Sequence, residues 1–235
     1  MTIYWMLLLA WGAGLMAFLG GTIAYLEGSA NTVTKREFVH GITAFGGGIL
    51  MAAVAFALVP EGMKELNAWQ LALLFALGGV SFAIVDAWLA KHGGNVAQFM
   101  AMLLDFLPEA ISLGALFAVS PNTAILLAVF IAAQNLPEGF NAYRELRFAQ
   151  LSSKIALAGL FGVSLFGPVA ALMGYWWLRD APEITAMIMS FAAGGILYLV
   201  FQDIAPQARM RRHWTPSLGA VFGFIVGMLS KQLLG

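Results

Sequence analysis

Two stretches of the 235-residue chain place carboxylates and amides inside long apolar runs. The first reads DFLPEAISLG over 105–114, and the second reads QNLPEGFNAY over 134–143. Each contains Leu-Pro-Glu and a small residue, with a polar side chain four positions before the glutamate. A charged group within a bilayer is costly and normally faces a protein interior or a water-filled path. These two stretches are therefore the first candidates for chemistry.

The spacing within each stretch predicts one polar stripe on a helix. Residues at i, i+4 and i+7 share a helical face. The predicted stripes comprise Asp105, Glu109 and Ser112 on one helix, and Gln134, Glu138 and Asn141 on the next, with Asn135 beside Gln134. Pro108 and Pro137 each leave one backbone carbonyl without its usual donor, which predicts a bend at the same depth as the acids.

The two stripes are expected to face each other. Only Ser-Pro-Asn separates the two apolar runs, so the helices form an antiparallel hairpin. At ~1.5 Å per residue, Asp105 and Gln134 lie about 20 Å from that turn, within the middle of a ~30 Å hydrocarbon layer. Carboxylate and amide oxygens from both helices can then surround one ion.

The residue types favour a cation as the occupant. Neither Lys nor Arg falls in the middle of an apolar run, so the carboxylates have no basic partner there. Two carboxylates without a basic partner favour a divalent cation over an anion. Two alternatives stay open, a proton path and carboxylates that are protonated or paired for structure alone.

Composition identifies the elements that must position these residues. The chain is 61% hydrophobic and 10% charged, with mean hydropathy +0.85, whereas globular domains carry about 25% charged residues. The prediction is an all-α integral membrane protein in the lipid bilayer, with a retained first helix. Eight apolar runs are long enough to span, at about 3–26, 38–60, 69–90, 96–119, 122–143, 153–178, 183–204 and 215–233.

The distribution of basic residues predicts the orientation. The first, third, fifth and seventh loops hold nine of the twelve Lys and Arg residues, and cytoplasmic loops are enriched in them. Both termini should therefore be extracytosolic. The net charge is zero and cysteine is absent, so we expect neither a nucleic-acid partner nor thiolate ligands.

A glycine stripe in the last span allows close helix packing. Gly219, Gly223 and Gly227 recur every four residues, which lets another backbone approach. Packing within the chain is the preferred interpretation, and a homodimer contact is the alternative.

Taken together, these features resemble the ZIP (Zrt/Irt-like protein) family of divalent metal transporters. The resemblance rests on eight spans, a glycine-rich second span ending in LVPEG (58–62), the two LPE motifs, and FAAGGILYLVFQDIAP (191–206). It implies elevator-like uptake of a divalent metal into the cytosol, with spans 1, 4, 5 and 6 moving against spans 2, 3, 7 and 8. It also implies a plasma-membrane location, which we expect to be a bacterial inner membrane.

The resemblance carries metal-ligand positions onto Glu109, Gln134, Asn135 and Glu138, and places Asp105 where the family usually has histidine. Phe106 and Gly167 stand where two ligands of a second metal usually lie, so we expect one metal, with Asn135 peripheral. Asp203 falls in a region that resembles a metal exit site. Met51 is a further, weaker candidate ligand, with packing in the core preferred.

The identity of the metal is the main open question. Zinc is the family's default, but carboxylate and amide oxygens suit harder ions than imidazole does, so manganese, iron(II) and cadmium stay alternatives. The metal is cargo and no cofactor is expected. A proton-coupled carrier and a non-transporting metal sensor remain alternatives. An intramembrane enzyme is disfavoured, since no HExxH, GxSG or GxGD pattern occurs.

Overall fold

The computed structural model describes residues 2–28, 32–92, 97–210 and 213–234, and these are helical apart from short connections. Eight helical segments in the described part are long and apolar enough to cross a membrane. This confirms the predicted all-α fold and the number of spans.

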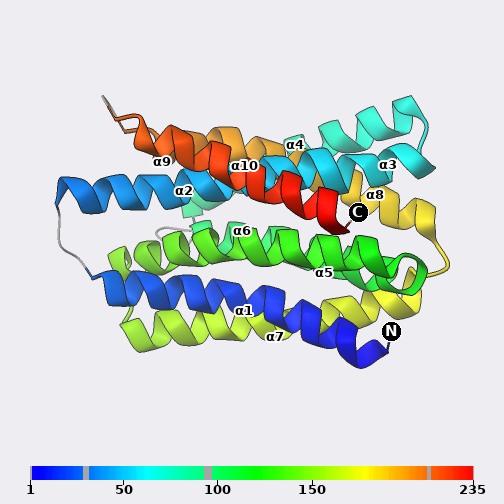
Figure 1. The fold of residues 1–235 in the computed structure, drawn as a ribbon, viewed down its shortest axis with the longest axis horizontal. Coiled ribbons are helices and arrows are strands. Elements are labelled where there is room, and N and C mark those ends of the chain that lie inside the picture. The colour runs from blue at the N-terminus through cyan, green and yellow to red at the C-terminus, as the bar shows by residue number, and fades with distance from the viewer. Residues whose placement is uncertain (1, 29–31, 93–96, 211–212, 235) are drawn as a thin grey trace.

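Successive spans run in opposite directions through the bundle (Figure 1). Their bounds are α1 (Ile3–Glu27), α2 (Val33–Ala53) continuing through η1 (Val54–Leu58) and α3 (Val59–Glu65), α4 (Ala68–His92), α5 (Ala97–Val119), α6 (Pro121–Phe148), α7 (Ser153–Trp177), α8 (Pro182–Leu199) continuing through η3 (Val200–Ile204) and α9 (Ala205–Ala208), and α10 (Thr215–Leu234). The two termini lie at the same end of the bundle (Figure 1).

The second and seventh spans each contain a π-helical turn that ends two residues before a proline. Pro60 and Pro206 lack the N–H that an α-helix needs, and each follows one wide turn. The N–H of Val59 donates to the carbonyl of Val54, and that of Ala205 donates to Val200. Each turn therefore absorbs one extra residue before its proline, and η3 carries Asp203.

The helices pack as two groups (Figure 1). In group one, α1 packs against α6 and α7, and α5 packs against the same two helices. In group two, α2 packs against α10, and α8 packs against α3 and α4. The groups meet where α2 contacts α6 and α5 contacts α8.

Reciprocal glycines hold four helix pairs together, and each pair lies inside one group. A β-carbon on any of them would lie 1.9–2.0 Å from a carbonyl oxygen of the facing helix, so only glycine permits these approaches. The pairs are Gly20 with Gly139 (α1 and α6), Gly114 with Gly174 (α5 and α7), Gly48 with Gly223 (α2 and α10), and Gly78 with Gly194 (α4 and α8).

The predicted glycine stripe of the last span therefore packs within the chain. Gly219 faces the backbone of Gly41, Gly223 faces that of Phe45, and Gly227 faces the side chains of Ala52 and Phe130. Two of these contacts are with α2 backbone, and Ala52 also belongs to α2. This confirms the preferred interpretation of that stripe.

Contacts between the two groups are of another kind. Gly46 of α2 faces the ring of Pro137 on α6, and Gly227 of α10 faces the ring of Phe130 on α6 as well as Ala52 of its own group. These glycines meet side chains across the interface, and no described glycine meets backbone of the other group as the reciprocal pairs do inside each group.

Candidate metal site

The centre of the candidate site is a direct contact between the two polar helices. The Gln134 amide donates a hydrogen bond from Nε2 to Oε2 of Glu109, at 2.7 Å. Both side chains are at most 1% exposed. The α5–α6 hairpin thus brings the two predicted stripes together inside group one.

The pairing is offset by one turn from the level expected from sequence. From residue 120, ~1.5 Å per residue puts the Glu109 backbone at about 16 Å and that of Gln134 at about 21 Å, whereas the expectation set Asp105 level with Gln134. Helical side chains lean toward the N-terminus of their own helix. In this antiparallel hairpin that lean brings Glu109 and Gln134 toward each other, so Gln134 pairs with Glu109.

The second acidic pair opens onto a small cavity. Asp105 and Glu138 both line a space of about 50 Å³ that is also bordered by Thr43 and Asn141. Asp105 is 4% exposed. Because the same lean operates one turn farther along, Asp105 and Glu138 form the next level of the site.

Several oxygen atoms around this centre are buried and find no hydrogen-bond partner among the described residues. They are Asp105 Oδ1, Glu109 Oε1, Ser112 Oγ, Gln134 Oε1, Asn135 Oδ1 and Glu138 Oε2. A buried polar atom without a partner is costly, and native proteins contain few of them. A bound cation would satisfy such a gathering of acceptors.

Two amides are held by neighbouring helices, which limits how they can act. Asn135 donates from Nδ2 to the carbonyl of Ala13 on α1, at 3.0 Å, and its Oδ1 stays free of a described partner. The Asn141 Oδ1 accepts a hydrogen bond from Thr43 at 3.2 Å. Asn141 is therefore the weaker candidate ligand, because its oxygen already accepts a hydrogen bond from Thr43 of α2.

No three His, Cys, Asp or Glu side chains in the described ranges converge closely enough to hold a metal by themselves. The acids instead lie in two levels, with Glu109 beside Gln134 and Asp105 on the cavity with Glu138. The oxygens of Gln134, Asn135 and Ser112, which find no partner among the described residues, are the further acceptors beside these carboxylates.

Asp203 continues the acidic path beyond Asp105. It lines the cavity that Asp105 and Glu138 border, and also an adjoining cavity of about 140 Å³. That second cavity is lined by Asp86 and Glu145 as well. Sequence reasoning missed both of these acids, because each stands near a helix end where an acid is ordinary; Asp86 accepts a hydrogen bond from Tyr198 at 2.9 Å.

Met51 does not join this cluster. It lines a different and larger cavity together with Val200 and Phe224, and it packs against the apolar core. The acids of the α5–α6 hairpin do not border that cavity. The structure thus places Met51 against the core and apart from the carboxylates of the α5–α6 hairpin.

The comparison with known proteins identifies the family. The profile of the ZIP zinc transporter family matches residues 95–234, which is more than half of the chain and includes both polar helices. The chain belongs to the ZIP zinc transporter family.

Two curated relatives are similar to this ZIP family member over most of its length. The human zinc transporter ZIP11 is 30% identical over 173 residues, covering 63% of this chain and 47% of the relative. Zinc transporter ZIP11 of cattle is 29% identical over 172 residues, covering 62% and 47%. The chain thus spans about half the length of these relatives. Both are animal proteins, which gives the expected bacterial inner membrane no support.

Phe106, one of the two residues that stand at expected second-metal ligand positions, is a packed aromatic ring in this ZIP family member. Phe106 is 1% exposed, and its Cζ would lie 2.8 Å from a β-carbon at Gly14 and at Gly167. The ring fits because both glycines leave room for it. Where the resemblance expects an asparagine and a glutamate, this chain has a packed apolar contact.

Proposed function

We propose that this chain carries a divalent metal cation across the membrane into the cytosol. The observation that carries the proposal is the set of buried, unpartnered oxygens on the α5–α6 hairpin. We assign the primary site to Asp105, Glu109, Gln134 and Glu138, with Asn135 and Ser112 at its edge.

The donor set bears on the choice of metal. Each assigned ligand atom is an oxygen, whereas zinc sites usually include imidazole or thiolate. Zinc is proposed because the family description and both relatives name it. Manganese is the competing cargo, because an all-oxygen site suits a harder ion; iron(II) and cadmium belong in the same test.

We propose that group one moves relative to group two as the elevator. The support is the packing: each reciprocal glycine pair lies inside a group, whereas Gly46 meets the Pro137 ring across the interface. Helices interlocked through backbone contacts move as a unit, and an interface of side chains allows sliding. The metal would leave through the cavity that joins Asp105 to Asp203.

The test is uptake by proteoliposomes containing the full chain. Zinc, manganese, iron(II), cadmium, cobalt and magnesium are supplied outside at two pH values, and internal metal is measured over time. Glu138→Ala should abolish uptake of the preferred metal. The matched control is Glu183→Ala, which removes an exposed carboxylate at the start of α8.

Other outcomes decide between the alternatives. Equal uptake of every metal by wild type and Glu138→Ala would show that the assigned site is wrong. Metal binding without uptake would identify a sensor. Movement of protons driven by pH in the absence of metal would identify a proton carrier.

A further inference from the structure

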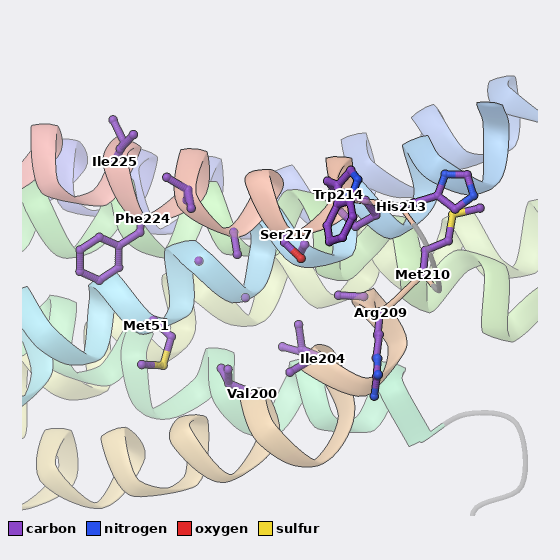
Figure 2. Close-up of a pocket in the computed structure, with 18 residues that line it drawn as sticks. Met51, Val200, Ile204, Arg209, Met210, His213, Trp214, Ser217, Phe224 and Ile225 are labelled. Carbon is purple, nitrogen blue, oxygen red and sulfur yellow. The ribbon is translucent and has the colours of Figure 1, made fainter. Parts of the chain in front are cut away.

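A large cavity lies in group two, apart from the carboxylates of the α5–α6 hairpin. It has a volume of about 850 Å³. The small residues Ala44, Gly47 and Gly48 of α2 line it. The labelled side chains of α10 lie on one side of it and those of η3–α9 on the other (Figure 2). We call this space the α2–α10 groove.

The sides of the α2–α10 groove are apolar and reach the outer surface of the bundle. Val200 and Ile204 line one side, and Phe224 and Ile225 line the other. Val221, at the rim on α10, is 52% exposed. In a membrane this surface faces acyl chains, so the groove is open to lipid.

The length of the groove matches one leaflet. Its lining on α10 extends from Pro216 to Ile225, which are nine residues apart and so cover about 14 Å. That is about half of a ~30 Å hydrocarbon layer. A single acyl chain entering from one membrane surface would therefore fill the groove to its inner end.

The end of the groove beside the seventh loop is lined by polar and basic side chains. Arg209, His213, Trp214 and Ser217 line this end. Arg209 extends from the η3–α9 side, and His213, Trp214 and Ser217 lie on the α10 side (Figure 2). The His213 ring nitrogen Nδ1 contacts a carboxylate oxygen of Glu37. Arg209 is exposed and forms no ion pair with a carboxylate of the described residues. Trp214 is 82% exposed, as is usual for a side chain at the headgroup level.

The location of this end of the groove favours a ligand with an anionic headgroup. It lies in the seventh loop, one of the four loops that together hold nine of the twelve basic residues. This bias favours the cytosolic leaflet, where anionic lipids concentrate and where basic pockets between helices bind their headgroups.

We propose that the α2–α10 groove binds an anionic phospholipid of the surrounding bilayer. One acyl chain lies between α10 and η3–α9, and the headgroup phosphate contacts Arg209. The lipid would cover the outside of η3, the turn whose Asp203 lines the inner cavities. This proposal does not rest on metal transport, and its test does not use metal flux.

The test measures lipid binding to the delipidated full chain by native mass spectrometry. Phosphatidylglycerol is the anionic probe, and phosphatidylcholine with the same acyl chains is the zwitterionic one. Arg209→Gln removes the proposed headgroup contact, and Val221→Trp fills the groove from its rim. The matched controls are Lys154→Gln, which removes a basic charge at the start of α7, and Val80→Trp on the exposed face of α4.

Wild type and both controls should prefer phosphatidylglycerol by roughly fivefold to tenfold, as one basic contact implies. Arg209→Gln should lose that preference, and Val221→Trp should weaken the binding of both lipids. Circular dichroism establishes that each variant is folded before lipid is added.

Three results would overturn the proposal. One is equal binding of the two lipids by wild type. Another is an equal effect of each variant and its control. The third is a two-chain species that Val221→Trp dissociates, which would assign the groove to a second copy of the chain.

Discussion

The contact between α1 and α6 can be tested by one added methyl group. A β-carbon at Gly139 would lie 2.0 Å from the carbonyl oxygen of Ala17. Ordinary contact begins at 3.4 Å, so 3.4 minus 2.0 leaves 1.4 Å to be made up by movement. The obstacle is helix backbone, which cannot rotate aside, so α1 and α6 must separate.

The expected cost follows from two opposing effects. Overpacking costs about 1–3 kcal/mol, and a rigid backbone obstacle places Gly139→Ala at the upper end. Replacing glycine by alanine in a helix contributes about 0.5–1 kcal/mol in the other direction. The net loss is about 2 kcal/mol, which corresponds to a melting temperature lower by about 4–8 °C for a chain of this size.

Thermal unfolding followed by circular dichroism in detergent measures the effect. The matched controls are Gly12→Ala on α1 and Gly162→Ala on α7, because a β-carbon at either position meets nothing within 4 Å. Both controls should melt at or slightly above the wild-type temperature. If Gly139→Ala melted at the same temperature as these controls, α1 and α6 would not pack as described.

The same substitution connects packing to the site. Asn135 on α6 donates to Ala13 of α1, so separation of the two helices lengthens that hydrogen bond. Gly139 also follows Glu138 directly. Metal affinity of Gly139→Ala should therefore fall together with stability, and unchanged affinity would show that the site does not depend on this contact.

Three further predictions concern the site and its exit. Gly167→Ala should destabilise the chain by about 1–3 kcal/mol, because its β-carbon would meet Ala10 O at 2.6 Å and the Phe106 ring at 2.8 Å; melting temperatures measure this against Gly162→Ala, and equal values for the two would contradict the placement of Phe106. The preferred metal at about 100 times its dissociation constant should stabilise wild type by about 2.7 kcal/mol, measured as a rise in melting temperature that a chelator reverses. Glu138→Ala should lose that rise, and a retained rise would place the metal elsewhere. Asp203→Asn should lower the maximal rate of uptake in proteoliposomes while leaving equilibrium metal affinity at the central site unchanged, because Asp203 lines the cavities of the proposed exit path without belonging to the proposed primary ligand set. A matched loss of affinity would assign it to the site itself.

Hydropathy and residue spacing were enough to predict the eight spans, the two polar stripes and the hairpin that joins them. The eight spans could be predicted because an apolar run of this length must cross a bilayer as a helix, with its backbone satisfied internally. The polar stripes could be predicted because carboxylates are expensive at that depth and recur at helical spacing. The antiparallel hairpin could be predicted because the three residues Ser120, Pro121 and Asn122 are too few to connect the two spans in any other way.

Tertiary structure decided how those elements meet. That Gln134 pairs with Glu109 depends on the lean of side chains in an antiparallel pair, which residue counting alone does not include. The place of Met51, in the α2–α10 groove and away from the carboxylates of the α5–α6 hairpin, depends on which face of α2 meets α10.

Which helix each closely packed glycine contacts was also decided by the tertiary structure. A glycine in sequence shows that a close approach is allowed, but not which helix makes it; Gly223 meets Phe45 across 178 positions of chain. The fit of Phe106 over Gly14 and Gly167 likewise joins three separate helices. Spacing within a helix is a local property and can be read from the sequence, whereas contacts between helices depend on how all eight pack together.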